Sequence, residues 1–264
     1  WFKAWPKGIQ STLELNNEAI PFGDIFFEIG GVKIGFEICE DAWVARRPGT
    51  DLALQGVDLI LNPSASHFAF GKTRVRERFV IEGSRAFAVG YVYANLLGNS
   101  SGRAVYDGDA IIASGGELLA RGSRFGYDDV RVTEAVVEID RNRMMQSQQG
   151  GYRPDFSGEI GECVITEFEF PDVLPEPPPG IDVPPEPDPG WESSVHRKEE
   201  EFTRAVSLAL FDYLRKSFSR GFVVSLSGGA DSTAVACLCS LMVDLAVADL
   251  GLEGVLGKVS HLPN

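Results

Sequence analysis

Prolines crowd into one stretch of this chain, and no other feature limits the possible folds as strongly. Nine of the 15 prolines lie between Pro171 and Pro189, in the run PDVLPEPPPGIDVPPEPDP. Proline has no backbone N–H to donate to a helix or a strand ladder, and such density favours an extended, semi-rigid spacer. The pattern predicts two domains, at 1–170 and 193–264, joined by a linker over 171–192. A surface excursion within a single domain is the alternative.

Length and charge bound what the two parts can be. The 264 residues suffice for one large or two ordinary domains, and 44% apolar residues can fill a core. The formal charge is −14, which would repel nucleic acids and anionic membranes. We therefore expect no nucleic-acid and no membrane partner.

The cysteines indicate a reducing compartment. Their spacing fits no zinc site and is too sparse for a disulfide scaffold. We recognise no signal peptide and no long uncharged apolar span, so a soluble, cytoplasmic location is expected. The chain starts at Trp1 without an initiator methionine and stops at Asn264 shortly after a helical pattern, so we expect a piece of a longer protein. The cysteines are Cys39, Cys163, Cys237 and Cys239.

The first domain alternates predicted strands with loops and one helix. Residues 24–29 and 32–38 form a hairpin pattern around Gly30-Gly31, and residues 72–88 show helical periodicity with a basic start. Apolar or β-branched runs predict the remaining strands. These are 57–61, 89–95, 109–113 and 135–139.

The second domain begins with a helix, a strand and a helix. Residues 193–217 have an amphipathic helical pattern, 222–226 an apolar strand pattern and 233–245 a second helical pattern. The sequence SLSGGADS, residues 225–232, lies between that strand and that helix. Free N–H groups at a helix start attract phosphate, and glycine lets the backbone approach it closely.

This glycine turn predicts an ATP or pyrophosphate site. A carboxylate beside a phosphate needs a bridging cation, so Asp231 is interpreted as a Mg²⁺ ligand. A plain helix entry capped by Asp231 or Ser227 is the alternative. The turn, which follows an apolar strand, resembles the pyrophosphate loop of the N-type ATP pyrophosphatases. The candidate site residues are Leu226, Ser227, Gly228, Gly229, Ala230, Asp231 and Ser232.

A cysteine at the exit of the first hairpin is the candidate nucleophile. Cys39 stands in the sequence ICEDAW, before two acids that should hold its thiol protonated. On spacing alone, a structural cysteine is the alternative. An apolar strand ending in Cys-Glu-Asp-x-Trp resembles the nucleophile segment of the carbon–nitrogen hydrolase (nitrilase) superfamily. The resemblance implies attack on an amide carbon, with a base glutamate and an oxyanion lysine expected upstream of Trp1.

The loop after the next strand resembles the substrate loop of glutamine-hydrolysing members of that superfamily. The resemblance implies that Ser66 accepts from the glutamine α-ammonium, while Lys72 or Arg74 pairs with its α-carboxylate. Glu40 and Trp43 are assigned to the same glutamine site. His67 is interpreted as a packing or capping residue. The segment from residue 94 to 130 also resembles this amidase domain, with Tyr106-Asp107-Gly108 as a structural turn.

The order of amidase, spacer, helix and pyrophosphate loop resembles the family of glutamine-dependent NAD synthetases. The resemblance implies that Cys39 forms a thioester with glutamine and releases ammonia. ATP with Mg²⁺ then activates nicotinic acid adenine dinucleotide as an adenylate, and ammonia displaces AMP to give NAD. Because ammonia must travel as NH₃, a dry internal passage is expected. The resemblance also implies homo-oligomers.

The implied fold is α/β: part of a four-layer α-β-β-α nitrilase-type sandwich, then the start of a parallel-sheet nucleotide-binding domain. This piece alone is predicted to hydrolyse little or no glutamine. Two other functions stay open: another glutamine-fed adenylating amide synthetase, and a non-catalytic scaffold in which Cys39 is core.

Overall fold

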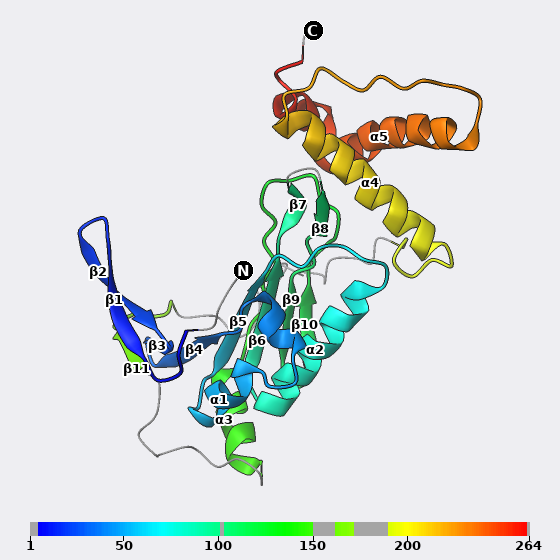
Figure 1. The fold of residues 1–264 in the computed structure, drawn as a ribbon. Helices are drawn as coiled ribbons and strands as arrows, with labels where there is room; N and C mark the ends of the chain where they lie inside the picture. The colour runs from blue at the N-terminus through cyan, green and yellow to red at the C-terminus, as the bar shows by residue number, and fades with distance from the viewer. Residues whose placement is uncertain (1–4, 101–102, 150–161, 172–189, 263–264) are drawn as a thin grey trace.

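A computed structural model describes residues 5–100, 103–149, 162–171 and 190–262, and most of the predicted linker falls outside these ranges. A seven-stranded mixed sheet organises the first half, in the order β10-β9-β6-β5-β4-β3-β11 (Figure 1). β4, β5 and β6 run parallel, and β11 pairs in parallel with β3. The strands are β3 (Ile25–Ile29), β4 (Val32–Phe36), β5 (Leu59–Ser64), β6 (Gly90–Asn95), β9 (Ile111–Ser114), β10 (Glu117–Arg121) and β11 (Glu162–Thr166).

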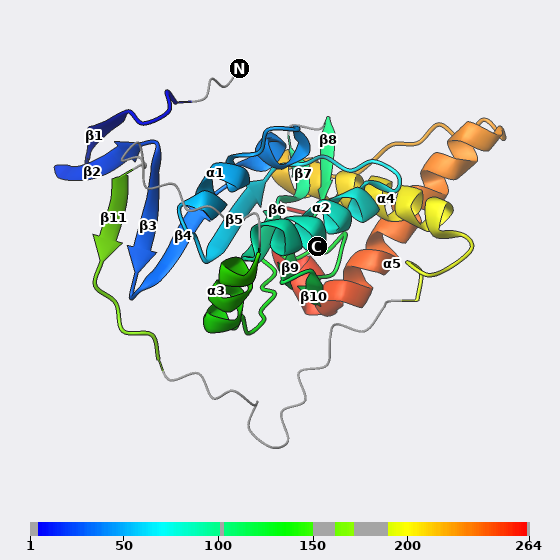
Figure 2. The same cartoon turned by 90° about the horizontal axis from the view of Figure 1, so that it is seen from below.

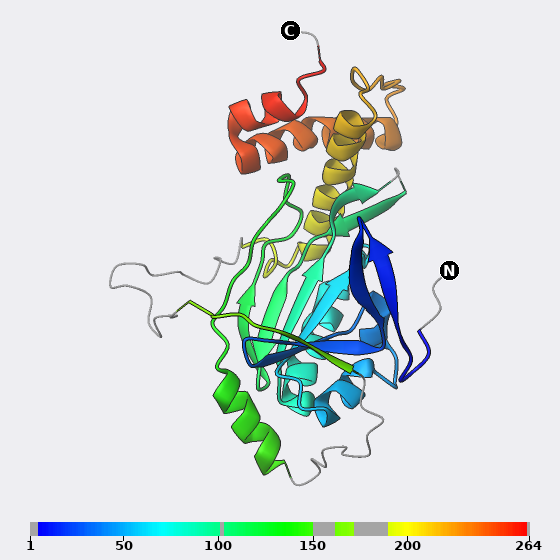
Figure 3. The ribbon, with the colours of Figure 1, turned by 90° about the vertical axis from the view of Figure 1, so that its left-hand side faces the viewer.

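Helices cover one face of this sheet. α1 (Pro48–Leu54) and α2 (Lys72–Phe87) lie behind it in Figure 3, and the other face carries no helix in that view. The core side chains facing α2 include Ile60, Tyr91 and Ile111, all fully buried. The alternate residues Leu59 and Leu61 are only half-buried. The predicted α/β class is confirmed, and the described residues supply two of the four layers expected of the sandwich.

Two antiparallel hairpins stand apart from the main sheet. β1 (Gln10–Leu15) and β2 (Glu18–Gly23) meet at Asn16-Asn17, where both residues have positive φ, as type I′ hairpin turns require. β7 (Leu97–Ser100) and β8 (Ala104–Asp107) form the second hairpin, which projects toward the C-terminal helices. Neither hairpin was anticipated from the sequence.

The second half consists of two packed helices. α4 (Arg197–Lys216) and α5 (Ala230–Lys258) lie beyond the β7–β8 hairpin, away from the β11 edge of the sheet (Figure 2). Their core is shared with the first half, because Phe125 and Tyr127 cluster with Phe211 of α4 and Met242 of α5. The two predicted halves therefore share this apolar cluster, while a second cluster lies entirely within the first half.

Two predicted strands are absent from the described residues. Residues 222–226 form no strand, and Val223 and Leu226 are exposed. Residues 135–138 form no strand, and α3 (Ile139–Gln148) begins where that strand was expected to end. A strand needs a neighbour to satisfy its backbone groups, and an apolar run alone does not provide one.

The last helix is longer and more apolar than predicted. α5 starts at Ala230, extends past the expected end at residue 245, and kinks at Gly251. By length and composition alone it could cross a membrane, with a mean hydropathy of 2.0 over its most apolar window. This span was missed from the sequence. α5 starts from a glycine turn and packs along α4, and the parallel sheet expected for this half has no strand among the described residues.

Candidate functional site

The candidate nucleophile lies where β4 turns into a short 3₁₀ helix, η1 (Cys39–Trp43). Cys39 is partly exposed, and its φ of 49° is in the left-handed region that non-glycine residues rarely adopt. The Asp41 carboxylate accepts the N–H of Ile38 at 2.8 Å and so fixes the turn. Unfavourable backbone conformations of this kind concentrate at functional sites. Cys39 is thus presented at a sharp strand-end turn rather than sealed in the core.

Two of the predicted glutamine-site residues, Trp43 and Lys72, lie close together beside this turn. The Lys72 ammonium lies 5.5 Å from the centre of the Trp43 ring and donates to the His67 carbonyl at 3.0 Å. Burial lowers the pKa of Lys72, as does the nearby Arg76 cation, whereas the charges of Asp107 and Cys39 act in the opposite direction. Lys72 is therefore held between the ring of Trp43 and the backbone of the substrate loop.

Ser66, Glu40 and Arg74 have different surroundings. Ser66 is buried, and its N–H donates to Asn95 Oδ1 at 2.8 Å. Glu40 is exposed on η1. Arg74 is exposed and lines a groove on the outer face of α2 with Arg78 and Arg121, so Lys72 is the better placed candidate for the glutamine carboxylate.

A buried carboxylate network supports the strand ends beneath Cys39. Glu37 is fully buried and accepts from Arg47 Nη2 at 2.6 Å, from the N–H of Gly49 at 2.8 Å and from Tyr91 Oη at 2.6 Å. Asn62 Nδ2 donates to Tyr91 Oη at 3.0 Å. With all these partners Glu37 cannot serve as a free base. Its role is to hold β4, β5 and β6 in register at the end that carries the nucleophile.

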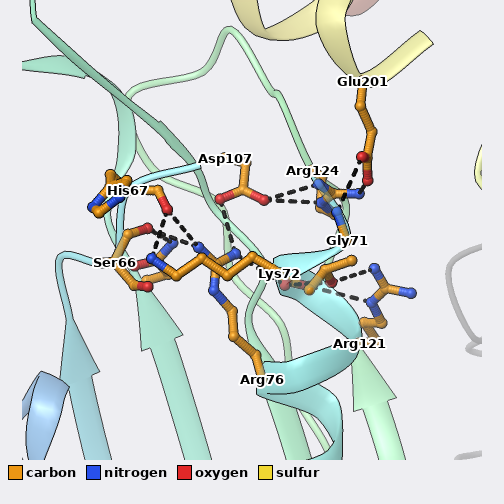
Figure 4. A network of polar contacts seen from close by, with 12 residues as sticks. Ser66, His67, Gly71, Lys72, Arg76, Asp107, Arg121, Arg124 and Glu201 are labelled. Carbon is orange, nitrogen blue, oxygen red and sulfur yellow. Dashed lines mark hydrogen bonds and ion pairs between the residues drawn. The ribbon is translucent and has the colours of Figure 1, made fainter. Parts of the chain in front are cut away.

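A second buried network lies behind the substrate loop (Figure 4). Arg76 is fully buried, donates to the Ser66 carbonyl at 2.7 Å and pairs with Asp107 at 2.8 Å. Arg124 pairs with the other oxygen of Asp107 at 3.0 Å and with Glu201 of α4 at 2.9 Å. Asp107 is therefore structural, as the prediction for Tyr106-Asp107-Gly108 had it.

These supporting residues were missed from the sequence. Arg76 alternates with Arg74 and Arg78 in the basic start of the predicted helix, and nothing in that run of charges separates the buried arginine from the exposed ones. The available signal was helical spacing, because Arg76 precedes the buried Val80 by four residues and so shares its inward face. Glu201 gave little local signal: Arg197 pairs with it one turn earlier on α4, but Gly71 and Arg124 lie more than seventy residues away.

The candidate phosphate loop is exposed, and its backbone conformation requires glycine. Gly228 has a φ of 82° with no atom near where a Cβ would be, and Gly229 is the N-cap of α5 without any side-chain cap. Ser232 Oγ and Thr233 Oγ1 both donate to the Gly229 carbonyl. The alternative of a helix capped by Asp231 or Ser227 is wrong, and the first N–H groups of α5 are left for a ligand.

Asp231 lies exposed in the first turn of α5. Among the described residues no three potential metal ligands cluster there or elsewhere. Mg²⁺ is commonly held by one or two carboxylates, with phosphate oxygens and waters completing the shell. A single carboxylate beside a phosphate loop fits that pattern, so Asp231 could hold Mg²⁺ together with a nucleotide.

Known proteins resemble both halves of the chain. The NAD synthase family matches residues 202–257, which contain most of α4 and α5. A glutamine-dependent NAD(+) synthetase from Oryza sativa subsp. indica is 34% identical over 95% of the chain. The Homo sapiens enzyme of the same name is 32% identical over the whole chain. The chain spans about a third of the length of these relatives: 34% and 38%.

Solved structures agree with these matches. A glutamine-dependent NAD(+) synthetase from Cytophaga hutchinsonii superposes on 98% of the chain with a TM-score of 0.68 and 36% identity, and the chain covers 33% of it. A synthetase of the same name from Acinetobacter baumannii, solved with adenosine diphosphate, shares the fold over 93% of the chain with a TM-score of 0.51 and 18% identity. The resemblance that the two sequence motifs suggested is confirmed.

Proposed function

We propose that this chain is part of a glutamine-dependent NAD(+) synthetase, a carbon–nitrogen ligase. The observation that carries the proposal is the alignment of its relatives across both candidate sites at once. The thiol turn at Cys39 and the glycine turn before α5 each have a geometry suited to one half of that reaction.

In the amidase half, the Cys39 sulfur would attack the side-chain amide carbon of glutamine. A carbon–sulfur bond forms, the carbon–nitrogen bond breaks, and ammonia leaves; water then cleaves the thioester to release glutamate. Lys72, which lies against the ring of Trp43, would pair with the substrate carboxylate. The general base and the oxyanion lysine are not among the assigned residues, and we expect both outside this chain.

In the synthetase half, the N-terminus of α5 would bind the pyrophosphate of ATP. Gly228 and Gly229 allow close backbone approach, and Ser227 and Ser232 offer hydroxyl groups. Asp231 would hold Mg²⁺, which neutralises phosphate charge when bound. The carboxylate of nicotinic acid adenine dinucleotide would be adenylated with loss of pyrophosphate, and ammonia would then displace AMP. A dry ammonia passage, a homo-oligomer and a cytoplasmic location stay predictions.

The two other functions differ in what supports them. The partly exposed Cys39 with its left-handed backbone argues against a scaffold with a core cysteine. The named relatives favour NAD synthesis over another amide synthetase.

A single assay tests the proposal in the full-length protein. Nicotinic acid adenine dinucleotide, ATP, Mg²⁺ and glutamine labelled with ¹⁵N in its amide should give NAD carrying the label. Formation of a different amide, or no ATP-dependent product with either glutamine or ammonium, would refute it.

A further inference from the structure

The helix that carries Lys72 begins in an electrostatically unfavourable way. Its N-cap is Gly71, with a φ of 71° and no side-chain cap, and no acidic residue lies in its first turn. Lys72 and Arg74 instead bring positive charge to the positive end of the helix dipole, which disfavours helix formation there. Asp109 partly compensates from within the amidase half, by accepting from Thr73 Oγ1 at 2.6 Å.

A carboxylate from the second half completes this helix end. Glu201 of α4 is 2% exposed, and its Oε2 accepts the N–H of Gly71 at 3.4 Å. A glutamate three residues into a helix makes the same bond to the N-cap in a capping box. In α2 that third position is Arg74, which cannot accept a hydrogen bond.

The same carboxylate reaches the substrate loop through buried ion pairs. Glu201 Oε1 accepts from Arg124 at 2.9 Å, Arg124 pairs with Asp107, and Asp107 pairs with Arg76, which donates to the Ser66 carbonyl (Figure 4). Side chains that are locked by buried partners hold a binding loop in one geometry. Every residue in this series of contacts except Glu201 belongs to the amidase half.

The neighbouring helix α1 shows that such a cap need not come from outside. Its N-terminal Gly49 donates to Glu37, which lies two residues before the nucleophile in the same half. α2 has no equivalent acid of its own. The amidase half thus supplies the capping carboxylate for α1 itself. For α2 the capping carboxylate comes from α4.

We propose that Glu201 is a positioning residue for glutamine, supplied by the synthetase half to the amidase half. It fixes the N-terminus of α2, and with it Lys72, and it anchors the carbonyls of the substrate loop. This inference rests on the proposed function, because Lys72 must bind the glutamine carboxylate for the cap to matter to turnover.

The test compares E201Q with E200Q in the full-length protein. Glu200 precedes Glu201 on α4 and pairs with Arg204 at the surface, so E200Q controls for the loss of one charge. We expect E201Q to raise the KM for glutamine by about tenfold, the loss typical of one charged hydrogen bond. The kcat with glutamine and all constants with ammonium chloride should match the wild type. An unchanged glutamine KM in folded E201Q would overturn the inference, as would an equal loss with ammonium.

A milder variant and a second measurement keep the test decisive. If E201Q does not fold, E201D retains the charge but withdraws it by one methylene, and an unchanged glutamine KM there would also overturn the inference. Amide hydrogen exchange at residues 71–74 should quicken in E201Q and stay unchanged in E200Q. Hydrogen exchange can be measured without turnover. If the wild type shows no glutamine-dependent activity, the proposed function is refuted, and the exchange rates still test whether Glu201 caps α2.

Discussion

The nucleophile turn lies at a strand end and the phosphate loop lies at a helix start. The first is supported by buried charged side chains, and the second is exposed to solvent. Beneath Cys39 the strand ends are tied by fully buried charges, with Glu37 accepting from Arg47 and Tyr91. The phosphate loop is exposed from Ser225 to Asp231, and its local hydrogen bonds involve its own hydroxyls.

The difference reflects what each site must do. A thiol attacking an amide carbon has to be held at one place and angle, so its supports are rigid and buried. A loop that receives a nucleotide can let phosphate oxygens organise its N–H groups, because glycine leaves the space open. Variants in the first region should therefore change stability or chemistry, and variants in the second should change nucleotide use.

Removal of the nucleophile should give the largest effect. In the full-length protein, Cys39→Ala should lower glutamine-dependent NAD formation by at least about 10,000-fold and spare synthesis from ammonium, because only the amidase half needs the thiol. Cys163→Ala is the matched control, since burial raises the pKa of that thiol and so disfavours its thiolate. Residual glutamine-dependent turnover in the alanine variant would place the nucleophile elsewhere.

Loss of a buried cation should give the next largest effect. Arg76 pairs with both Asp107 and Asp109, and Arg76→Met removes this shared cation while both carboxylates stay buried. The substitution should lower the free energy of unfolding by about 3–5 kcal/mol. Urea denaturation measures this. Arg74→Met, on the exposed face of the same helix, should shift it by no more than about 0.5 kcal/mol. Equal shifts for the two variants would mean that the buried network does not stabilise the fold.

Loss of the loop carboxylate should affect only nucleotide use. Asp231→Asn should lower NAD formation by about 100-fold from glutamine and from ammonium alike, while glutamate release by the thiol site continues. Asp244→Asn, on an exposed face of the same helix, should have no effect. If raised Mg²⁺ concentrations fail to restore any activity to Asp231→Asn, a role in metal binding is contradicted.

Acid should weaken the contact between the β7–β8 hairpin and α4, with the smallest effect. Burial raises the pKa of Asp212, but Lys216, the N–H of Asn99 and Arg215 outweigh it, so the pKa lies below its ordinary value of 3.8. The stabilisation is complete above the unfolded-state pKa and disappears as the pH falls through the lower folded-state pKa.

Melting temperatures of the wild type and Asp212→Asn measured from neutral to acidic pH test this point. Their difference should be constant above the ordinary carboxyl pKa and should shrink below it. A difference that stays constant into the acid range would show that Asp212 acts through shape rather than charge.

Local patterns in the sequence were enough to predict much of this molecule. The hairpin of β3 and β4, the helices α2 and α4, and the glycine turn were each recognisable within about 25 residues, where periodicity and turn chemistry are informative. Lys72 does lie against Trp43, in the short helix that begins at Cys39, whereas the glutamine-binding role of these residues stays a prediction.

Long-range contacts account for what the sequence did not reveal. β11 pairs with β3 across more than a hundred residues, and the strand expected at 222–226 finds no partner among the described residues. Arg76 and Glu201 are charged residues that only burial makes structural, and burial is a property of the assembled fold. Sequence patterns therefore identified the reactive groups better than the side chains that support them.

Glu201 also bears on how such proteins can be recombined. The proline-rich stretch looks like the natural seam for exchanging one catalytic module with another, yet the acid that finishes the amidase lies beyond it on α4. A chimaera joined within that stretch would inherit a foreign residue at this position. Grafts that carry the opening turns of α4 along with the amidase should work where simpler splices fail.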